Sequence, residues 1–240
     1  MAVSSLCVQE LMSDHKAAAT GTEIELKLRV PDLAALMRIC VAAGAKPAQT
    51  AIQRNQYLDN DRKLDAAKYL LRLRAESTST SSQHFLTAKG PAQKSADGTL
   101  SFVPEEEIEL SVEVAAAVRA GTVDVLGLLD NGSAQRRALV KNMRAIADGP
   151  VAVVGGFTNE RTRLDVDFPE GFSGTLELDR VLFPGDQIHH EVEFEVPAGI
   201  DPLQAKAAFE ALFVRGDVKG SASPGKARRF FKALKGERLL

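Results

Sequence analysis

Charged and apolar residues alternate almost without exception along Thr22–Pro31, whose sequence is TEIELKLRVP. The charged side chains occupy one parity of this segment and the apolar side chains occupy the other. Because alternate side chains of a β-strand point to opposite faces, the pattern predicts a strand with one charged face and one apolar face. A single strand of this kind is also compatible with a solvated outer face, so the interpretation depends on whether other segments repeat the pattern.

Five further segments repeat this alternation of charged and apolar residues: Leu70–Arg74, Glu107–Val114, Arg161–Phe168, Thr175–Leu178 and His190–Val196. Closing such strands into a barrel removes the exposed sheet edges and turns the charged faces inward. We therefore predict an α+β fold, in which helices cover the apolar outer wall of a closed β-barrel with a charged interior. Burying so many charges is costly unless they pair or bind ions, which favours a highly charged ligand.

The composition limits the classes of protein to which the chain can belong. Its 240 residues include 30 Lys and Arg against 32 Asp and Glu, so it lacks the basic character typical of DNA-binding proteins. Two cysteines, Cys7 and Cys40, are too few for a disulfide framework and fit a reducing compartment. No apolar run approaches the roughly 18–20 residues of a membrane-spanning helix. We expect a cytoplasmic protein without DNA or membrane partners, with organelle targeting by the N-terminus as an open alternative.

The chain is predicted to form one domain after an N-terminal tail. Residues 1–21 lack strand periodicity and the basic start of a secretory signal, so we expect them to be flexible. No linker separates the strand segments, which indicates a single domain over residues 22–240. Capping residues and apolar spacing predict helices, and further β patterns predict two more strands. The helices are Pro31–Ala45, Val123–Leu129, Ala134–Ala147, Asp201–Arg215 and Ser223–Lys235, and the strands are Asn55–Asp59 and His84–Lys89, with loops over Glu76–Gln83 and Gly90–Thr99.

Several short motifs resemble those of one known family. The motif Glu23-x-Glu25-x-Lys27 is similar to the Glu-x-Glu-x-Lys hallmark of the CYTH superfamily, the triphosphate tunnel metalloenzymes. Further matches follow in the family order: Leu71–Arg74, Leu86–Pro91, Glu105–Glu109, Leu176–Arg180 and Glu191–Glu195. The stretch Gly155–Arg161, together with Lys226, resembles the plant-type inorganic triphosphatases. The resemblance implies an eight-stranded antiparallel β-tunnel that binds triphosphate substrates together with divalent metal ions.

A triphosphate carries many acceptor oxygens and several negative charges, so cations must line its path. Arg suits multidentate contact with phosphate, and Lys supplies a mobile point charge. Seven cations are candidate substrate-binding residues, on the inward parity of the strands or near the last helix: Lys27, Arg72, Arg74, Lys89, Arg161, Arg163 and Lys226. Salt bridges to neighbouring acids are the alternative role, and the two roles are compatible because such pairs can hold the tunnel together.

Carboxylates beside a triphosphate would repel it unless a hard cation lies between them. Mg²⁺ or Mn²⁺ can share oxygen ligands from Glu and from phosphate, and we expect two such ions. The candidate metal ligands are Glu23, Glu25, Glu191, Glu193 and Glu195. Glu107 and Glu109 are open alternatives, either as ligands of a second ion or as part of a solvated strand. Glu25, Lys27 and Glu193 are the predicted catalytic residues.

The predicted reaction is metal-dependent hydrolysis of a terminal phosphoanhydride, most favourably that of inorganic tripolyphosphate. Thiamine triphosphatase, nucleoside or RNA triphosphatase and adenylyl cyclase activity are alternatives on the same fold. A non-catalytic polyphosphate- or nucleotide-binding module is an alternative of a different class. The chain has no Trp and only two Tyr, which favours a substrate without a base to stack. The sequence leaves the oligomeric state open.

Overall fold

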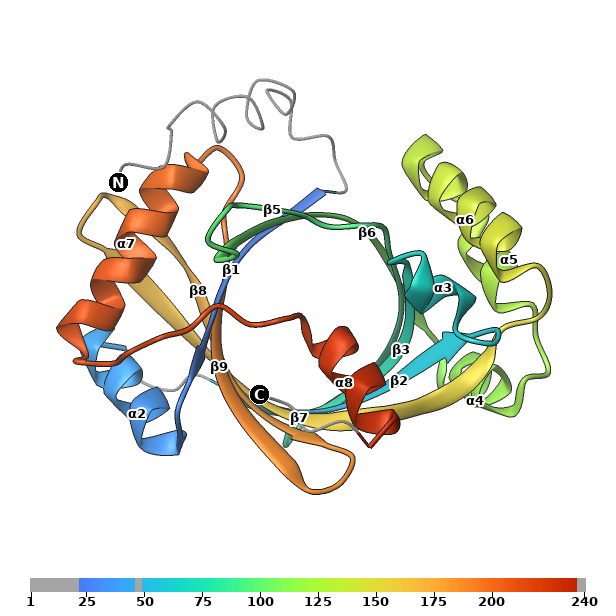
Figure 1. The fold of residues 1–240 in the computed structure, drawn as a ribbon, viewed down its shortest axis with the longest axis horizontal. Helices are drawn as coiled ribbons and strands as arrows, with labels where there is room; N and C mark the ends of the chain where they lie inside the picture. Colours follow the sequence, from blue (N-terminus) through green and yellow to red (C-terminus); the bar gives the residue numbers. More distant parts are fainter. Residues whose placement is uncertain (1–21, 46–48, 237–240) are drawn as a thin grey trace.

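The strands form one antiparallel sheet that closes on itself. The computed structural model describes residues 22–45 and 49–236, so the predicted tail over residues 1–21 lies outside the described residues. The strand order is β1-β9-β8-β7-β2-β3-β4-β6-β5, and β1 also pairs with β6, which closes eight strands into a barrel (Figure 1). The strands are β1 (Thr22–Val30), β2 (Gln49–Asp59), β3 (Leu70–Ser77), β4 (Ser82–Lys89), β5 (Gln93–Lys94), β6 (Leu100–Leu110), β7 (Ala152–Phe168), β8 (Phe172–Phe183) and β9 (Gln187–Glu195). The predicted α+β fold with an eight-stranded closed barrel is confirmed.

Helices cover the barrel wall on two sides and lie across one of its ends. Figure 1 looks along the barrel and shows α2 and α7 on one side, α3 to α6 on the other, and α8 across part of the opening. The helices are α2 (Leu33–Ala42), α3 (Lys63–Ala66), α4 (Val112–Ala120), α5 (Val125–Leu129), α6 (Ala134–Ala147), α7 (Pro202–Arg215) and α8 (Lys226–Leu234). In the described part of the chain, no helix is both long enough and apolar enough to cross a bilayer.

Two apolar layers hold these helices against the outer wall of the barrel. Beneath α2 and α7, the outward side chains of β1 and β9 pack with those of the helices, including Leu26, Ile39, Phe194, Phe209 and Phe213. Beneath α4 to α6, the outward side chains of β3 and β4 do the same, including Leu73, Leu86, Val118, Leu126 and Met143. The alternation in the sequence therefore separates an apolar outer wall from a charged interior, as predicted.

A third apolar cluster lies inside the barrel, at the end that α8 crosses. Tyr57, Phe157 and Phe183 come from β2, β7 and β8, and they pack with Phe230 and Phe231 of α8. The ring centroids of Tyr57 and Phe230 are 5.1 Å apart, a distance typical of tilted aromatic pairs. This aromatic cluster fixes α8, and it thereby fixes the cations that α8 directs into the barrel.

Local sequence signals explain most of the element boundaries. The carboxylate of Asp201 accepts the backbone N–H of Leu203 at 3.0 Å and begins α7 as predicted. The predicted strand over Glu107–Val114 is wrong at its end, because β6 stops at Leu110. There the Ser111 hydroxyl accepts the N–H of Val114 at 3.3 Å and begins α4, a helix that the strand pattern had concealed.

Candidate functional site

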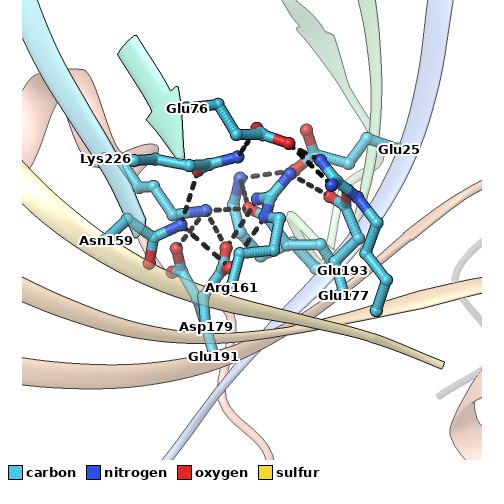
Figure 2. Close-up of polar contacts among 12 residues, drawn as sticks. Glu25, Glu76, Asn159, Arg161, Glu177, Asp179, Glu191, Glu193 and Lys226 are labelled. Atoms are coloured by element: carbon cyan, nitrogen blue, oxygen red, sulfur yellow. Dashed lines mark hydrogen bonds and ion pairs between the residues drawn. The ribbon is translucent and has the colours of Figure 1, made fainter. Parts of the chain in front are cut away.

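Charged side chains from the strands meet inside the barrel, and Arg161 of β7 lies at their centre (Figure 2). Its Nε and Nη2 atoms bond to the two oxygens of Asp179 at 2.8 and 2.6 Å, and Nη2 also lies 2.6 Å from Glu193. Glu177 completes the ring of acids around the guanidinium. Burial opposes the charge of Arg161, but the carboxylates of Asp179 and Glu177 outweigh it and raise its pKa.

Lys226, the first residue of α8, brings an ammonium into the same group of acids. Its Nζ lies 2.7 Å from Asp179, 2.6 Å from Glu191 and 2.7 Å from Glu193. Burial acts against the charged form, but these three carboxylates raise the pKa of Lys226. The cation therefore joins β8 and β9 to the helix that crosses the end of the barrel (Figure 2).

Arg229, one turn further along α8, holds Glu191 from the other side. The side chain of Arg229 is only 2% exposed and pairs with the Glu191 carboxylate. It also lies 2.9 Å from the Nδ1 atom of His189 and packs over the ring of Phe183. Burial, followed by the charges of Arg29 and Arg229, lowers the pKa of His189 to about 4, so its imidazole is neutral at physiological pH.

Lys27 connects the first strand with this group. Its ammonium bonds to Glu25 on its own strand and lies 2.9 Å from Glu193, its cross-strand partner on β9. Burial disfavours the charge of Lys27, but Glu193 and Glu25 raise its pKa well above the ordinary value. The three predicted catalytic residues, Glu25, Lys27 and Glu193, are therefore adjacent in space.

A second group of cations lies on β3 and β4. Lys89 lies 2.7 Å from Glu23 and pairs with Glu105, so it bridges the first strand and the acidic strand β6. Arg74 donates to Glu107 at 3.0 Å. Arg72 lies 3.6 Å from Glu107 and donates to the hydroxyl of Thr87 at 3.1 Å. Arg163 on β7 forms the link with β3, because it bonds to Glu76 at 2.8 Å. All seven predicted cations thus lie inside the barrel in ion pairs.

The carboxylates differ in how well cations compensate them. Among the described residues, no cation lies within ion-pair distance of Glu195, which is only partly exposed. Burial, then the charges of Glu23 and Glu177, raises the pKa of Glu195. Burial also raises the pKa of Glu25, with Glu193 as the next cause. Because Glu195 is the cross-strand partner of Glu25, these two acids form an undercompensated pair beside Glu23.

Asp179, Glu191 and Glu193 offer carboxylate oxygens within 4.8 Å of one another, a spacing that could hold a metal ion. All three are buried. Lys226 contacts all three carboxylates. One predicted metal ligand pair, Glu191 and Glu193, therefore lies within a possible metal-binding group, whose negative charge Lys226 partly neutralises.

Several interior residues were not predicted as site residues. Asp179 and Glu177 follow the alternation of β8, which identified their face but not their importance. Glu76 continues the inward parity of Arg72 and Arg74, although the Ser/Thr-rich stretch after it favours a loop. Gln53 and Asn159 carry no charge, so the alternation did not identify them. Gln53 donates to Glu76 at 2.6 Å, and Asn159 donates to Gln53 and to Asp179 at 2.9 Å each. Figure 2 shows Asn159 beside Asp179.

The geometry agrees with the comparison to known families, in which the CYTH domain matches residues 21–231. This chain belongs to the CYTH domain family. No curated protein sequence matches it. Among solved structures, a putative adenylyl cyclase from Hippeastrum, described as having a dominant triphosphatase activity, is 26% identical with a TM-score of 0.71. That similarity covers 90% of this chain and 97% of the Hippeastrum chain, and it agrees with the resemblance to plant-type triphosphatases.

Two more distant structures have the same fold. A putative adenylate cyclase from Bacillus halodurans is 19% identical with a TM-score of 0.61, covering 88% of this chain and 99% of its own. The triphosphatase of the Mimivirus capping enzyme is 10% identical with a TM-score of 0.53, covering 90% of this chain and 99% of its own. At these identities the similarity supports the barrel architecture.

Proposed function

We propose that this protein hydrolyses a terminal phosphoanhydride of inorganic tripolyphosphate inside the barrel, with the help of divalent metal ions. One observation carries the proposal. Seven cations and the carboxylates of the first and last strands converge in one enclosed interior, held by ion pairs such as that of Arg161 with Asp179 at 2.6 Å. Membership of the CYTH family and the similarity to a triphosphatase at 26% identity support it.

The cations of the barrel would bind the phosphate chain. Arg161 and Lys226 are fixed by several acids each, so their positions are set before a ligand arrives. Lys27, Arg72, Arg74, Lys89 and Arg163 extend the path along both walls. Phosphate oxygens can replace or share the carboxylate partners of these cations, because both are anionic oxygen acceptors. Such preorganised charge is the main requirement for stabilising a phosphoryl-transfer transition state.

The undercompensated carboxylates fit a divalent cation. Glu23, Glu25 and Glu195 repel one another, and hard ions such as Mg²⁺ or Mn²⁺ prefer carboxylate oxygens. We assign these three residues to metal binding, together with Glu191 and Glu193. Two ions remain our expectation. When bound, such ions would neutralise charge on the phosphoryl oxygens and lower the pKa of bound water.

The chain's own residues would then complete the reaction. We assign Glu25 to orienting the attacking water, since it lies beside Lys27 at the wall of the barrel. Lys27 and Glu193 form a 2.9 Å pair that keeps the ammonium directed toward the interior. We assign Lys27 to the transferred phosphoryl group. No side-chain nucleophile is required, because water attacks the phosphorus directly.

The aromatic residues favour an inorganic substrate over a nucleotide. Tyr57, Phe157 and Phe230 are buried and pack their rings on one another, so none of them offers an open face for a base. Phe85 lies on the inward face of β4, and the guanidinium of Arg74 lies over its ring at 5.0 Å. Thiamine triphosphate, nucleoside or RNA triphosphates and cyclisation of ATP are therefore secondary alternatives. The proposal treats residues 22–240 as one functional domain that acts in the cytoplasm without DNA or membrane partners.

A substrate panel tests the proposal. Phosphate release from tripolyphosphate, ATP and thiamine triphosphate should be measured with Mg²⁺, Mn²⁺ or EDTA, together with formation of cyclic AMP from ATP. We expect tripolyphosphate to give the largest kcat/KM and EDTA to abolish turnover. Preferred turnover of ATP or thiamine triphosphate would contradict the substrate assignment. Tight binding of tripolyphosphate without hydrolysis under every metal would instead indicate a binding module.

A further inference from the structure

A second group of cations lies between α3 and α8, on side chains that form no ion pair with the acids inside the barrel. Between α3 and α8 there is a cavity of about 220 Å³. Among the described residues, its lining consists of the cations Arg62, Arg228, Lys232 and Lys235, the carboxylate of Asp65 and the ring of Phe231. The whole chain carries a net charge of −2, so this local excess of positive charge does not follow from the overall composition. Clustered cations repel one another unless an anion lies between them.

The positions of these cations follow from helix geometry. Arg228 and Lys232 are four residues apart, so they share one face of α8, and Lys235 follows directly after the helix ends. Lys226 and Arg229, in contrast, belong to the face that contacts the acids inside the barrel. Within the ranges 22–45 and 49–236, no carboxylate lies within ion-pair distance of Arg228 or Lys232. One helix therefore presents two separate cationic surfaces.

Arg62 is held in the opposite wall of this cavity. Its backbone is left-handed, with φ of 62°, and so is that of Asp61, with φ of 49°. Such conformations are unfavourable for residues other than glycine and persist where the surroundings fix them. The guanidinium lies over the ring of Phe231 at 5.1 Å and pairs with Asp65. Its Nε is nevertheless buried without a hydrogen-bond acceptor among the described residues.

We propose that the cavity between α3 and α8 is a second anion site, which binds a small phosphoanion such as pyrophosphate. Arg228 and Lys232 would supply two positive charges to such an anion, and the guanidinium of Arg62 suits phosphate contact. The anion would give the Arg62 Nε an acceptor and separate Arg228 from Lys232. The proposal does not depend on hydrolysis in the barrel, although pyrophosphate would be one product of that reaction.

Calorimetric titration of the protein with pyrophosphate, in the presence of EDTA, tests this site. The full chain is compared with Arg228→Ala/Lys232→Ala and with the charge-matched control Arg137→Ala/Lys141→Ala on the exposed face of α6. Losing two charge-assisted contacts should weaken one binding step by about 100-fold or more, while the control leaves it unchanged. Equal isotherms for the full chain and the pocket variant would overturn the proposal. So would a step that is lost in Arg161→Ala and retained in the pocket variant, since pyrophosphate would then lie in the barrel.

Phosphate release from tripolyphosphate by the same variants separates this site from the proposed function. We expect the pocket variant to retain hydrolysis, because neither Arg228 nor Lys232 contacts the acids inside the barrel. A chain that binds pyrophosphate at the pocket but hydrolyses no triphosphate would contradict only the function. A chain that hydrolyses tripolyphosphate with an unchanged pyrophosphate isotherm in the pocket variant would contradict only the second site.

Discussion

Lys226 and Glu193 join the last helix to the last strand inside the barrel, with 2.7 Å between the ammonium and the carboxylate. The same carboxylate oxygen lies 2.9 Å from Lys27, and the other lies 2.6 Å from Arg161. Burial would raise the pKa of Glu193, but these three cations hold it well below its usual range. Cations from β1, β7 and α8 thus share one carboxylate. Glu193 therefore links two strands of the barrel wall to the helix that crosses the barrel's end.

Replacing Lys226 by Ala should reduce kcat/KM for tripolyphosphate by about 10²–10³-fold, the usual effect of removing one preorganised charge contact. It should also destabilise the protein by about 3 kcal/mol, because Asp179, Glu191 and Glu193 are buried and lose a shared cation. Phosphate release and denaturant unfolding measure the two effects. Lys219→Ala, an exposed substitution before α8, is the matched control and should change neither. Unchanged activity in Lys226→Ala would contradict the role of α8 in the site.

The aromatic cluster should govern how well α8 directs its cations. Phe230→Ala removes a fully buried ring that packs on Tyr57 and Phe157, so we expect a loss of about 3–5 kcal/mol in the free energy of unfolding. Leu234→Ala on the same helix is the control, since Leu234 is 46% exposed and should cost far less. Equal losses in the two variants would show that the cluster does not anchor the helix.

The loop between β5 and β6 should be fixed to α7 by a pH-dependent contact. Burial acts to raise the pKa of Asp97, but bonds from Ser95, Thr99 and Lys206 outweigh it and lower the pKa to about 2. An unfolded Asp has a pKa of about 4, so the contact stabilises the fold above that pH and is lost as the pH falls toward 2. Asp97→Asn should therefore cost up to about 1 kcal/mol at pH 7, since the group is half exposed. Unfolding curves at pH 7 and near pH 2 measure this, and an equal cost at both would contradict it.

The short helix α3 should depend on Asp59. The buried carboxylate of Asp59 accepts hydrogen bonds from the backbone N–H groups of Asn60, Leu64 and Asp65 at 2.7, 2.9 and 3.0 Å. Asp59→Ala leaves these donors without their acceptor and should lower the free energy of unfolding by about 1–3 kcal/mol. Asp65→Ala, which removes a more exposed carboxylate of the same helix, should cost less. Thermal or denaturant unfolding of both variants makes the comparison, and the reverse order would contradict the capping role.

Strict alternation of charge made much of the fold predictable. Every second residue is charged from Glu23 to Arg29 in β1, from Arg161 to Asp167 in β7 and from Glu191 to Glu195 in β9, so in these stretches the sequence alone indicates which face turns inward. The prediction of eight strands came from the family resemblance, because local sequence patterns do not determine how many strands a barrel contains. The start of α4 was missed, since the alternation from Glu107 to Val114 runs on through Ser111. Only the hydroxyl of Ser111, as a helix cap, marks the change from strand to helix.

The charged residues of the site were predictable from the sequence. The amide residues of the site were not, because they carry no charge. Lys27, Arg161 and Lys226 were identified from motifs, and the structure brings them together around Glu193. Gln53 and Asn159 connect Glu76 with Asp179 through bonds that depend on the closure of the barrel. Partners on β2, β3, β7 and β8 are remote in sequence, so their contacts follow from tertiary pairing rather than from local pattern.

The central claim is that the carboxylates of the first strand bind the metal ion that triphosphate hydrolysis requires. Phosphate release from tripolyphosphate should be measured against Mn²⁺ concentration for the native chain, Glu25→Gln and Glu109→Gln. Glu25→Gln should lose at least about 100-fold in kcat/KM and need far more Mn²⁺, because a neutral amide replaces an anionic ligand of a hard cation. Glu109→Gln should resemble the native chain, because Glu109 is exposed and accepts a hydrogen bond from Gln83 rather than contacting the acids of the first strand. Full turnover by the native chain in EDTA, or a Mn²⁺ dependence unchanged by Glu25→Gln, would contradict the account.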